Sequence, residues 1–190
     1  MDSNTSFIEA LVDEVMFFGE QLHLEDCQEL RRAFCRSVFQ FVDGVSSALK
    51  TNIFLSESPE SIGHDFYLAV QDKRRVLKGG KEKEIFVRNG FARNLSFAFD
   101  ASGAVMGVAR NIKGSNQDWQ RFKRCITIRN RVVHPSSLKD LEIKNSDILE
   151  MVAMFEWLKN LLVLSFIEDA SIHLEQAESL IACFSEAAEG

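Results

Sequence analysis

Residues that break helices are scarce in this sequence, which has only two prolines, Pro59 and Pro135, among its 190 residues. Long stretches with apolar residues at three- and four-residue spacing run between and beside them, and this spacing is typical of amphipathic helices. The chain is long enough for one compact domain and short for two. We therefore expect an all-α protein that forms a single helical domain over residues 1–190.

Cysteine pairs at metal-binding or redox spacing are also missing. Cys27, Cys35, Cys125 and Cys183 show no C-x-x-C arrangement and fall within helical patterns. This pattern is typical of small buried apolar residues in a reducing compartment. No carboxylate cluster with metal-ligand spacing is visible either, so we expect neither a metal nor another cofactor.

An uninterrupted apolar run of membrane length is absent too. The most apolar stretch, Met151 to Ile167, is interrupted by Glu156 and Lys159, and this indicates a buried helix of a soluble protein. The N-terminal residues are acidic and amphipathic, unlike the basic and then apolar start of a secretory signal. We expect a cytoplasmic protein that does not associate with membranes.

Positive charge is nearly absent from both ends of the chain, whose net charge is −6. Residues 1–30 carry eight acids and no Lys or Arg, and residues 140–190 carry eleven acids against two lysines. By contrast, residues 72–93 hold eight basic residues and three acids, and residues 110–134 hold seven and one. These basic segments would suit a phosphate backbone, or the polarity only aids solubility or subunit association.

Apolar spacing predicts four main helices around an elaborated middle segment. A loop or short turn is expected at residues 56–65, and two shorter helices within 66–115, where a small hairpin is possible in VLKGGKEKEIFV. Asp147 and Glu150 resemble the capping box that opens a helix. The four helices are Ser6 to about Leu22, about Leu24 to Phe54, Asn116 to His134, and a last one from Asp147 nearly to the chain's end.

The third of these helices carries an arginine in an unexpected place. At about 100° per residue, an apolar stripe forms with Arg129 near its middle, while Arg121, Arg124 and Arg131 fall on the opposite, solvated side. Burial of an unpaired guanidinium is very costly. Arg129 therefore forms a structural ion pair, extends to the bundle edge, or faces a cleft or subunit interface that receives an anion. The stripe comprises Trp119, Phe122, Cys125, Ile126, Val132 and Val133.

His134 ends the same helix. Pro135 disfavours helical geometry at the preceding residue, so His134 lies at or beyond the last turn. Asn130, four residues earlier, shares its face, whereas Arg129 points about 140° away. One subunit could bring Arg129 and His134 together, or two subunits related by a two-fold axis could share them.

The stretch RNRVVH, Arg129 to His134, resembles the R-x4–6-H signature of the HEPN superfamily (higher eukaryotes and prokaryotes nucleotide-binding). The polar residue directly after the arginine, the helix that the signature closes and the long final helix are similar to the family's pattern. The resemblance implies a HEPN-like helical bundle and a metal-independent endoribonuclease of phage defence or of a toxin–antitoxin system. It also implies a homodimer in which two signatures face one another, with RNA as substrate and a possible antitoxin or defence partner.

The same resemblance implies roles for the motif residues. His134 would be the general acid or base, Arg129 would stabilise the transition state, and Asn130 would orient the phosphate or His134. RNA carries its own nucleophile, the 2′-hydroxyl, so a proton shuttle and a fixed cation suffice for cleavage. Family toxins paired with nucleotidyltransferases tend to carry H-x-Y. Here Ser136 occupies the tyrosine position, so regulation through that tyrosine is not expected.

Two auxiliary residues complete the predicted site, Arg131 in the motif and Asp43 in the second helix. Asp43 would be a buried acid that pairs with Arg129, or it would only form a local arrangement with Arg36. Two other functions remain open: a non-catalytic HEPN-like module that binds a nucleotide or holds a dimer, and an unrelated helical adaptor in which Arg129 is structural.

Overall fold

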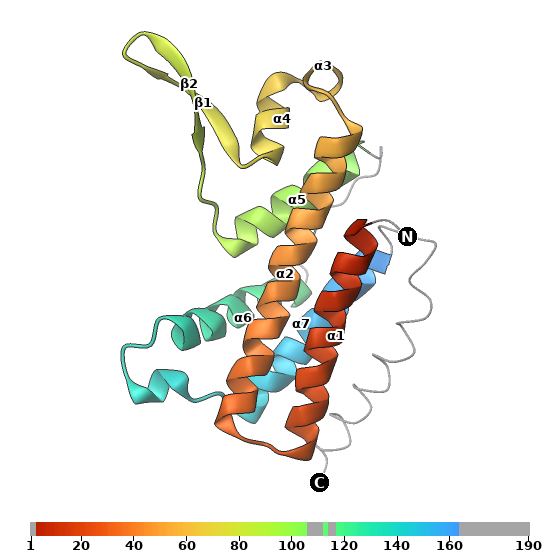
Figure 1. Cartoon of the computed structure of the whole chain (residues 1–190). Helices are drawn as coiled ribbons and strands as arrows, with labels where there is room; N and C mark the ends of the chain where they lie inside the picture. The colour runs from red at the N-terminus through yellow and green to blue at the C-terminus, as the bar shows by residue number, and fades with distance from the viewer. Residues whose placement is uncertain (1–2, 106–111, 114–116, 164–190) are drawn as a thin grey trace. The chain divides into compact units, whose positions relative to one another are not determined.

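A computed structural model describes residues 3–105, 112–113 and 117–163 of the chain (Figure 1). The expectation of a mostly helical protein is confirmed, and so is the small hairpin in the middle segment. The elements are α1 (Ser3–Leu24), α2 (Gln28–Ser56), α3 (Pro59–Ile62), α4 (His64–Val70), β1 (Lys73–Lys78), β2 (Lys81–Phe86), α5 (Phe91–Val105), α6 (Gln117–Val133), the 3-10 helix η1 (Leu138–Leu141) and α7 (Asn145–Val163).

The chain divides into two compact units. The first unit comprises Met1–Val42 and Ser115–Gly190, and the second comprises Asp43–Gly114. Helix α2 therefore contributes its first half to the first unit and its second half to the second. A single domain over the whole chain remains a prediction.

Aromatic and aliphatic side chains of α2, α6 and α7 form the core of the first unit. Phe41 of α2 contacts Phe155 of α7 edge to face, with ring centroids 4.9 Å apart. Trp157 of α7 contacts both Trp119 and Phe122 of α6. Most of the apolar stripe that the sequence predicted for α6 is buried, whereas Ile126 is partly buried and Val133, the last residue of the helix, is exposed.

The arginines on the other side of α6 all lie close to acids of α7, and Arg121 also pairs with Asp118 of α6. The prediction that they are solvated is wrong for Arg121 and Arg131, which are partly buried, and is confirmed for Arg124, which is exposed. Glu150 accepts hydrogen bonds from Arg124 at 2.8 Å and lies 3.7 Å from Arg121. Asp147 accepts from Arg131 at 2.9 Å. Only the Arg124 side chain is half exposed, at 52%. The acidic start of α7 thus neutralises the basic face of α6.

Helix α7 begins two residues before the predicted capping residue. Its first residue is Asn145, and the Asp147 carboxylate accepts a hydrogen bond from the backbone N–H of Lys144 at 3.0 Å. Asp147 is therefore the third residue of the helix, and its carboxylate caps the N–H of the residue before the helix. The predicted capping box, with Asp147 as the capping residue and Glu150 as its partner, is wrong. The part of the last helix predicted beyond Val163 lies outside the described residues.

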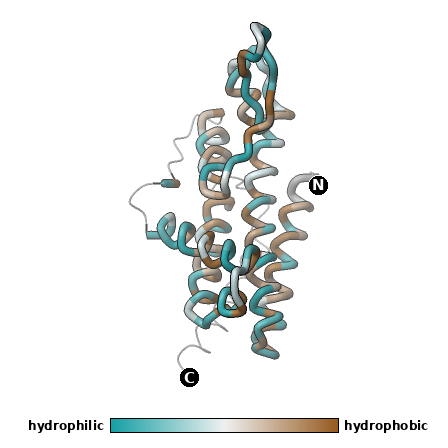
Figure 2. Tube along the Cα trace, turned by 90° about the vertical axis from the view of Figure 1, so that its left-hand side faces the viewer, coloured by the Kyte–Doolittle hydropathy of each residue, from teal (hydrophilic) through white to brown (hydrophobic). Residues whose placement is uncertain are grey.

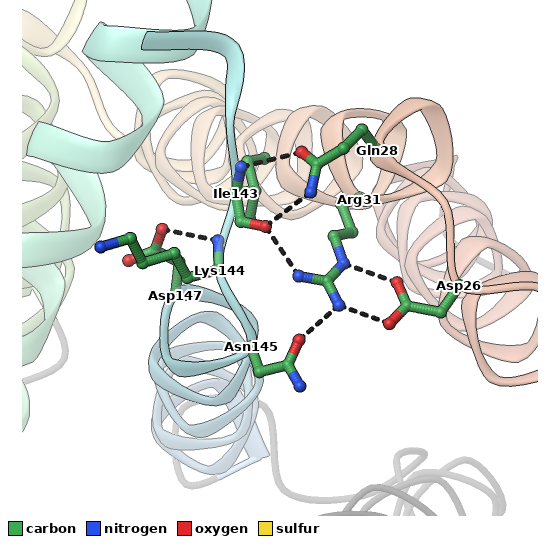
Figure 3. Close-up of polar contacts among 7 residues, drawn as sticks. All are labelled: Asp26, Gln28, Arg31, Ile143, Lys144, Asn145 and Asp147. Atoms are coloured by element: carbon green, nitrogen blue, oxygen red, sulfur yellow. Dashed lines mark hydrogen bonds and ion pairs between the residues drawn. The ribbon is translucent and has the colours of Figure 1, made fainter. Parts of the chain in front are cut away.

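The connector before α7 is fastened to the start of α2 (Figure 3). The Gln28 side chain donates to the carbonyl of Ile143 at 3.0 Å and accepts from its N–H at 2.9 Å. Arg31 donates to the same carbonyl at 2.7 Å and also bonds Asp26 and Asn145. Ile143 itself is fully buried. We call Asp26, Gln28, Arg31, Ile143 and Asn145 the connector clamp.

The second unit packs α3, α4 and α5 on the second half of α2, and the hairpin extends from these helices. Ile53, Val70 and Ala101 form a buried cluster, against which Phe66 and Phe97 pack. The hairpin turns at Gly79 and Gly80, whose φ angles are +62° and +73°. Such a two-residue turn with positive φ at both positions matches the right-handed twist of the strands, and glycine adopts it without steric cost.

A buried lysine ties the root of the hairpin to the helices. Lys50 of α2, whose side chain is 7% exposed, donates to Asp72 at 2.6 Å and also bonds Asn94 of α5. Asp72 stands between α4 and β1, and its carbonyl accepts from the N–H of Val87 after β2 at 2.7 Å. The Lys50 ammonium also lies 5.8 Å from the ring centroid of Phe97. One ammonium therefore joins three elements.

Replacement of Lys50 should therefore destabilise the protein. We expect Lys50→Ala to lower the free energy of unfolding by about 2 kcal/mol, because Asn94 loses a charged donor in a partly buried place. Lys50→Met, which keeps the aliphatic packing, should cost less. Urea unfolding followed by circular dichroism measures both. The control is Lys123→Ala on exposed α6 surface, for which a change within about 0.5 kcal/mol is expected. An equal effect of Lys50→Ala and Lys123→Ala would contradict this role.

Candidate functional site at the end of α6

The motif closes α6 as the sequence predicted. The last helical residue is Val133, and the backbone N–H of His134 still donates to the carbonyl of Asn130 at 2.9 Å. Pro135 follows outside the helix, and the His134 side chain is exposed. The prediction that His134 lies at or beyond the last turn is confirmed. Its imidazole is accessible to a ligand approaching the end of the helix.

Arg129 is half buried and lies on the side of α6 that faces α2. Its guanidinium donates to the side-chain oxygen of the adjacent Asn130 at 3.1 Å. Burial raises the pKa of the Cys35 thiol in α2 to about 12, and the nearby positive charge of Arg129 opposes this increase. Cys125, one turn before Arg129, is buried beside Cys35 and has a pKa raised to about 12 by burial as well. Asn130 thus accepts two hydrogen bonds within the motif: its side-chain oxygen accepts from Arg129, and its backbone carbonyl accepts from the N–H of His134.

Cys35 and Cys125 are buried and free, as the sequence predicted for cysteines that serve as small apolar residues. With thiols that stay protonated at neutral pH, Cys35 and Cys125 are poor nucleophiles. Cys27 is partly exposed, and Cys183 lies outside the described residues.

The segment after His134 is fixed by one carboxylate. Asp140 accepts hydrogen bonds from the backbone N–H groups of Ser136 and Ser137 at 2.9 and 2.8 Å, and from their hydroxyls at 2.7 and 3.0 Å. The hydroxyl and N–H of Ser136, followed by those of Ser137, hold the pKa of Asp140 below its usual value. The sequence S-L-K-D, Ser137 to Asp140, is itself a capping-box pattern and could have indicated this structure. The backbone that follows His134 is thereby constrained.

The two predicted auxiliary residues differ from expectation. Asp43 is exposed, so the premise of a buried acid is wrong. Its neighbours Val42 and Gly44 are buried, whereas Asp43 stays accessible to solvent, which avoids the cost of desolvation. Its pairing with Arg129 remains a prediction. Arg131 is held by Asp147 rather than solvated, and its auxiliary role in the site also remains a prediction.

The second unit contains a pocket of about 610 Å³ that sequence reasoning missed. Its polar lining includes Asp43, Lys50, Asp72 and Asn94, and its lining also includes the exposed aromatic residues Phe54 and Phe86. Lys50 lies on the broad buried face of α2, next to Leu49. Its position in this apolar stretch is the only feature of the sequence that could have indicated the pocket. Among residues 3–105, 112–113 and 117–163, no group of three His, Cys, Asp or Glu side chains could hold a metal ion.

The apolar surface of α7 bears on two predictions, that the protein does not associate with membranes and that it forms a homodimer. No described helix is both long enough and apolar enough to cross a bilayer. Between Met151 and Leu162, Asn160 is the only exposed residue, so the apolar faces of this part of α7 are covered within the chain. Surplus apolar surface on this segment therefore gives the predicted homodimer no support, and the homodimer remains a prediction.

Comparison with protein-family models, with curated proteins and with solved structures gave no match.

Proposed function

We propose that this protein is a metal-independent endoribonuclease of the HEPN kind, with its site at the end of α6. The observation that carries the proposal is the geometry of RNRVVH: Arg129 half buried and held by Asn130, and His134 exposed just beyond the last helical residue. A fixed cation and an accessible imidazole are the two groups that cleavage of RNA requires of a protein.

In the proposed reaction, His134 transfers a proton from the 2′-hydroxyl or to the departing 5′ oxygen. The bond from the 2′ oxygen to phosphorus forms while the bond from phosphorus to the 5′ oxygen breaks. The products are a 2′,3′-cyclic phosphate and a 5′-hydroxyl. Arg129 stabilises the negative charge that develops on the phosphoryl oxygens, and Asn130 keeps its guanidinium in place. Two copies of the site face one another in a homodimer, in a toxin–antitoxin or phage-defence setting.

Incubation of the purified protein with end-labelled tRNA and mRNA in EDTA tests the proposal. We expect cleavage that leaves cyclic phosphate ends, and a loss of about 10²- to 10³-fold in rate for Arg129→Ala. The matched control is Arg36→Ala, an exposed arginine of α2, which should cleave at the wild-type rate. Saturable binding of a mononucleotide with no RNA cleavage would instead support a non-catalytic binding module.

A further inference from the structure

The hairpin of the second unit has two faces of different charge. Side chains alternate between the faces of a strand, and residues paired across an antiparallel ladder share a face. From the register, in which Lys73 pairs with Phe86 and Lys78 with Lys81, the membership of both faces follows. The first face carries Lys73, Arg75, Leu77, Glu82, Glu84 and Phe86, and the second carries Arg74, Val76, Lys78, Lys81, Lys83 and Ile85.

The first face is neutralised and turned toward the helices of its own unit. Lys73 lies 3.6 Å from Glu84, and Arg75 lies 3.7 Å from Glu82. Arg75 also pairs with Asp65 of α4 at 2.7 Å. Lys73 and Phe86 line the pocket that α2 and α5 help to form. The two cations of this face are thus occupied by acids.

The second face carries four cations and no acid. Arg74, Lys78, Lys81 and Lys83 are all exposed, and they stand on a ribbon that projects from α4 and α5 (Figure 1). Much of this ribbon is hydrophilic, with hydrophobic residues between the polar ones (Figure 2). Exposed like charges on one small surface repel one another, so such an arrangement favours a polyanionic partner. We call Arg74, Lys78, Lys81 and Lys83 the basic face of the hairpin.

We infer that the basic face of the hairpin binds the phosphate backbone of RNA and acts as a substrate-binding arm separate from the cleavage site. A two-stranded ribbon is narrow enough to follow a nucleic-acid groove or a single strand, and Lys and Arg are the side chains that bind phosphates. The root of the hairpin is fixed by Lys50, Asp72 and Asn94, so the arm presents its cations in a constrained orientation. The choice of RNA among polyanions rests on the proposed function.

Two double variants that lose the same charge distinguish the contributions of the two faces to RNA binding. Arg74→Gln with Lys83→Gln removes one Arg and one Lys from the basic face, and Lys73→Gln with Arg75→Gln removes one of each from the neutralised face. Both are made in the full chain with His134→Ala, so that the RNA stays intact, and circular dichroism confirms that each is folded. Fluorescence anisotropy with a labelled single-stranded RNA measures binding between about 50 and 200 mM salt.

We expect the basic-face variant to bind RNA about tenfold more weakly and to reduce the slope of log K against log salt by about 1.4, as two lost phosphate contacts require. The neutralised-face variant should bind within about twofold of its parent. Equal losses in both variants, or competition by polyglutamate as strong as by RNA, would overturn the inference. Because the readout is binding, it is independent of cleavage: the arm stands if binding depends on the basic face even when the wild-type chain does not cleave RNA.

Discussion

His134→Ala is expected to lower the rate of RNA cleavage by at least about 10²-fold while leaving the melting temperature nearly unchanged. The imidazole is exposed at the end of α6, so its removal leaves no cavity in the core. The helix end is retained because the hydrogen bond to Asn130 comes from the backbone of residue 134. Single-turnover cleavage and differential scanning calorimetry on the same sample measure the two effects.

The control is His23→Ala, another exposed histidine at the end of a helix in the same unit. It should retain wild-type cleavage and stability. If His134→Ala unfolds the protein at a much lower temperature, His134 is a structural cap. If it is stable and still cleaves at the wild-type rate, the imidazole does not transfer the proton, and the proposed mechanism fails.

Arg31→Ala is expected to produce the largest loss of stability among the variants considered, about 2–3 kcal/mol in the free energy of unfolding. The Arg31 side chain is 12% exposed and connects Asp26, Asn145 and the carbonyl of Ile143. Because these partners join α2 to the connector that follows the motif, the loss is not confined to one helix. Urea unfolding at neutral pH measures the effect, and Arg36→Ala on the exposed side of α2 should change stability by less than about 0.5 kcal/mol.

The connector clamp also makes stability depend on pH. The hydrogen bonds from Arg31 hold the pKa of Asp26 below its usual value of 3.8. A lowered folded-state pKa stabilises the protein above the unfolded-state value, and this contribution is lost as pH falls below about 4. Since the Asp26 side chain is 52% exposed, solvent screening keeps the contribution small. The difference in stability between wild type and Arg31→Ala should therefore narrow as pH decreases from about 5 to 3. If the difference in stability between wild type and Arg31→Ala stays constant across this range, the protonation of Asp26 does not affect the interaction with Arg31.

Local rules were sufficient for several parts of this protein. The turn of the hairpin was predictable because two consecutive glycines adopt the positive φ angles that a two-residue turn requires. The end of α6 was predictable because Pro135 disfavours helical geometry at His134. The boundary of α7 was not, since the spacing of Asp147 and Glu150 predicted a start at Asp147. The helix instead begins at Asn145, and the Asp147 carboxylate accepts from the backbone N–H of Lys144.

The predictions that failed concern the environment of a side chain, that is, whether another part of the chain packs against it or it is exposed to solvent. Helical periodicity placed Arg131 away from the apolar stripe of α6, which is correct, and solvation was inferred from that alone. In the folded chain this side packs against α7, whose Asp147 and Glu150 meet the arginines of α6. Asp43 shows the converse, since it lies within an apolar stretch of α2 and is nevertheless exposed.

The sequence by itself determined the mostly helical class, the hairpin and the position of the motif at a helix end, because backbone preferences and apolar spacing act over a few residues. The tertiary structure decided which charges are neutralised, that Arg31 and Gln28 bind the backbone of Ile143, and that one face of the hairpin keeps four exposed cations. These features depend on pairs far apart in the chain, and on strand register, whose partners no local pattern specifies.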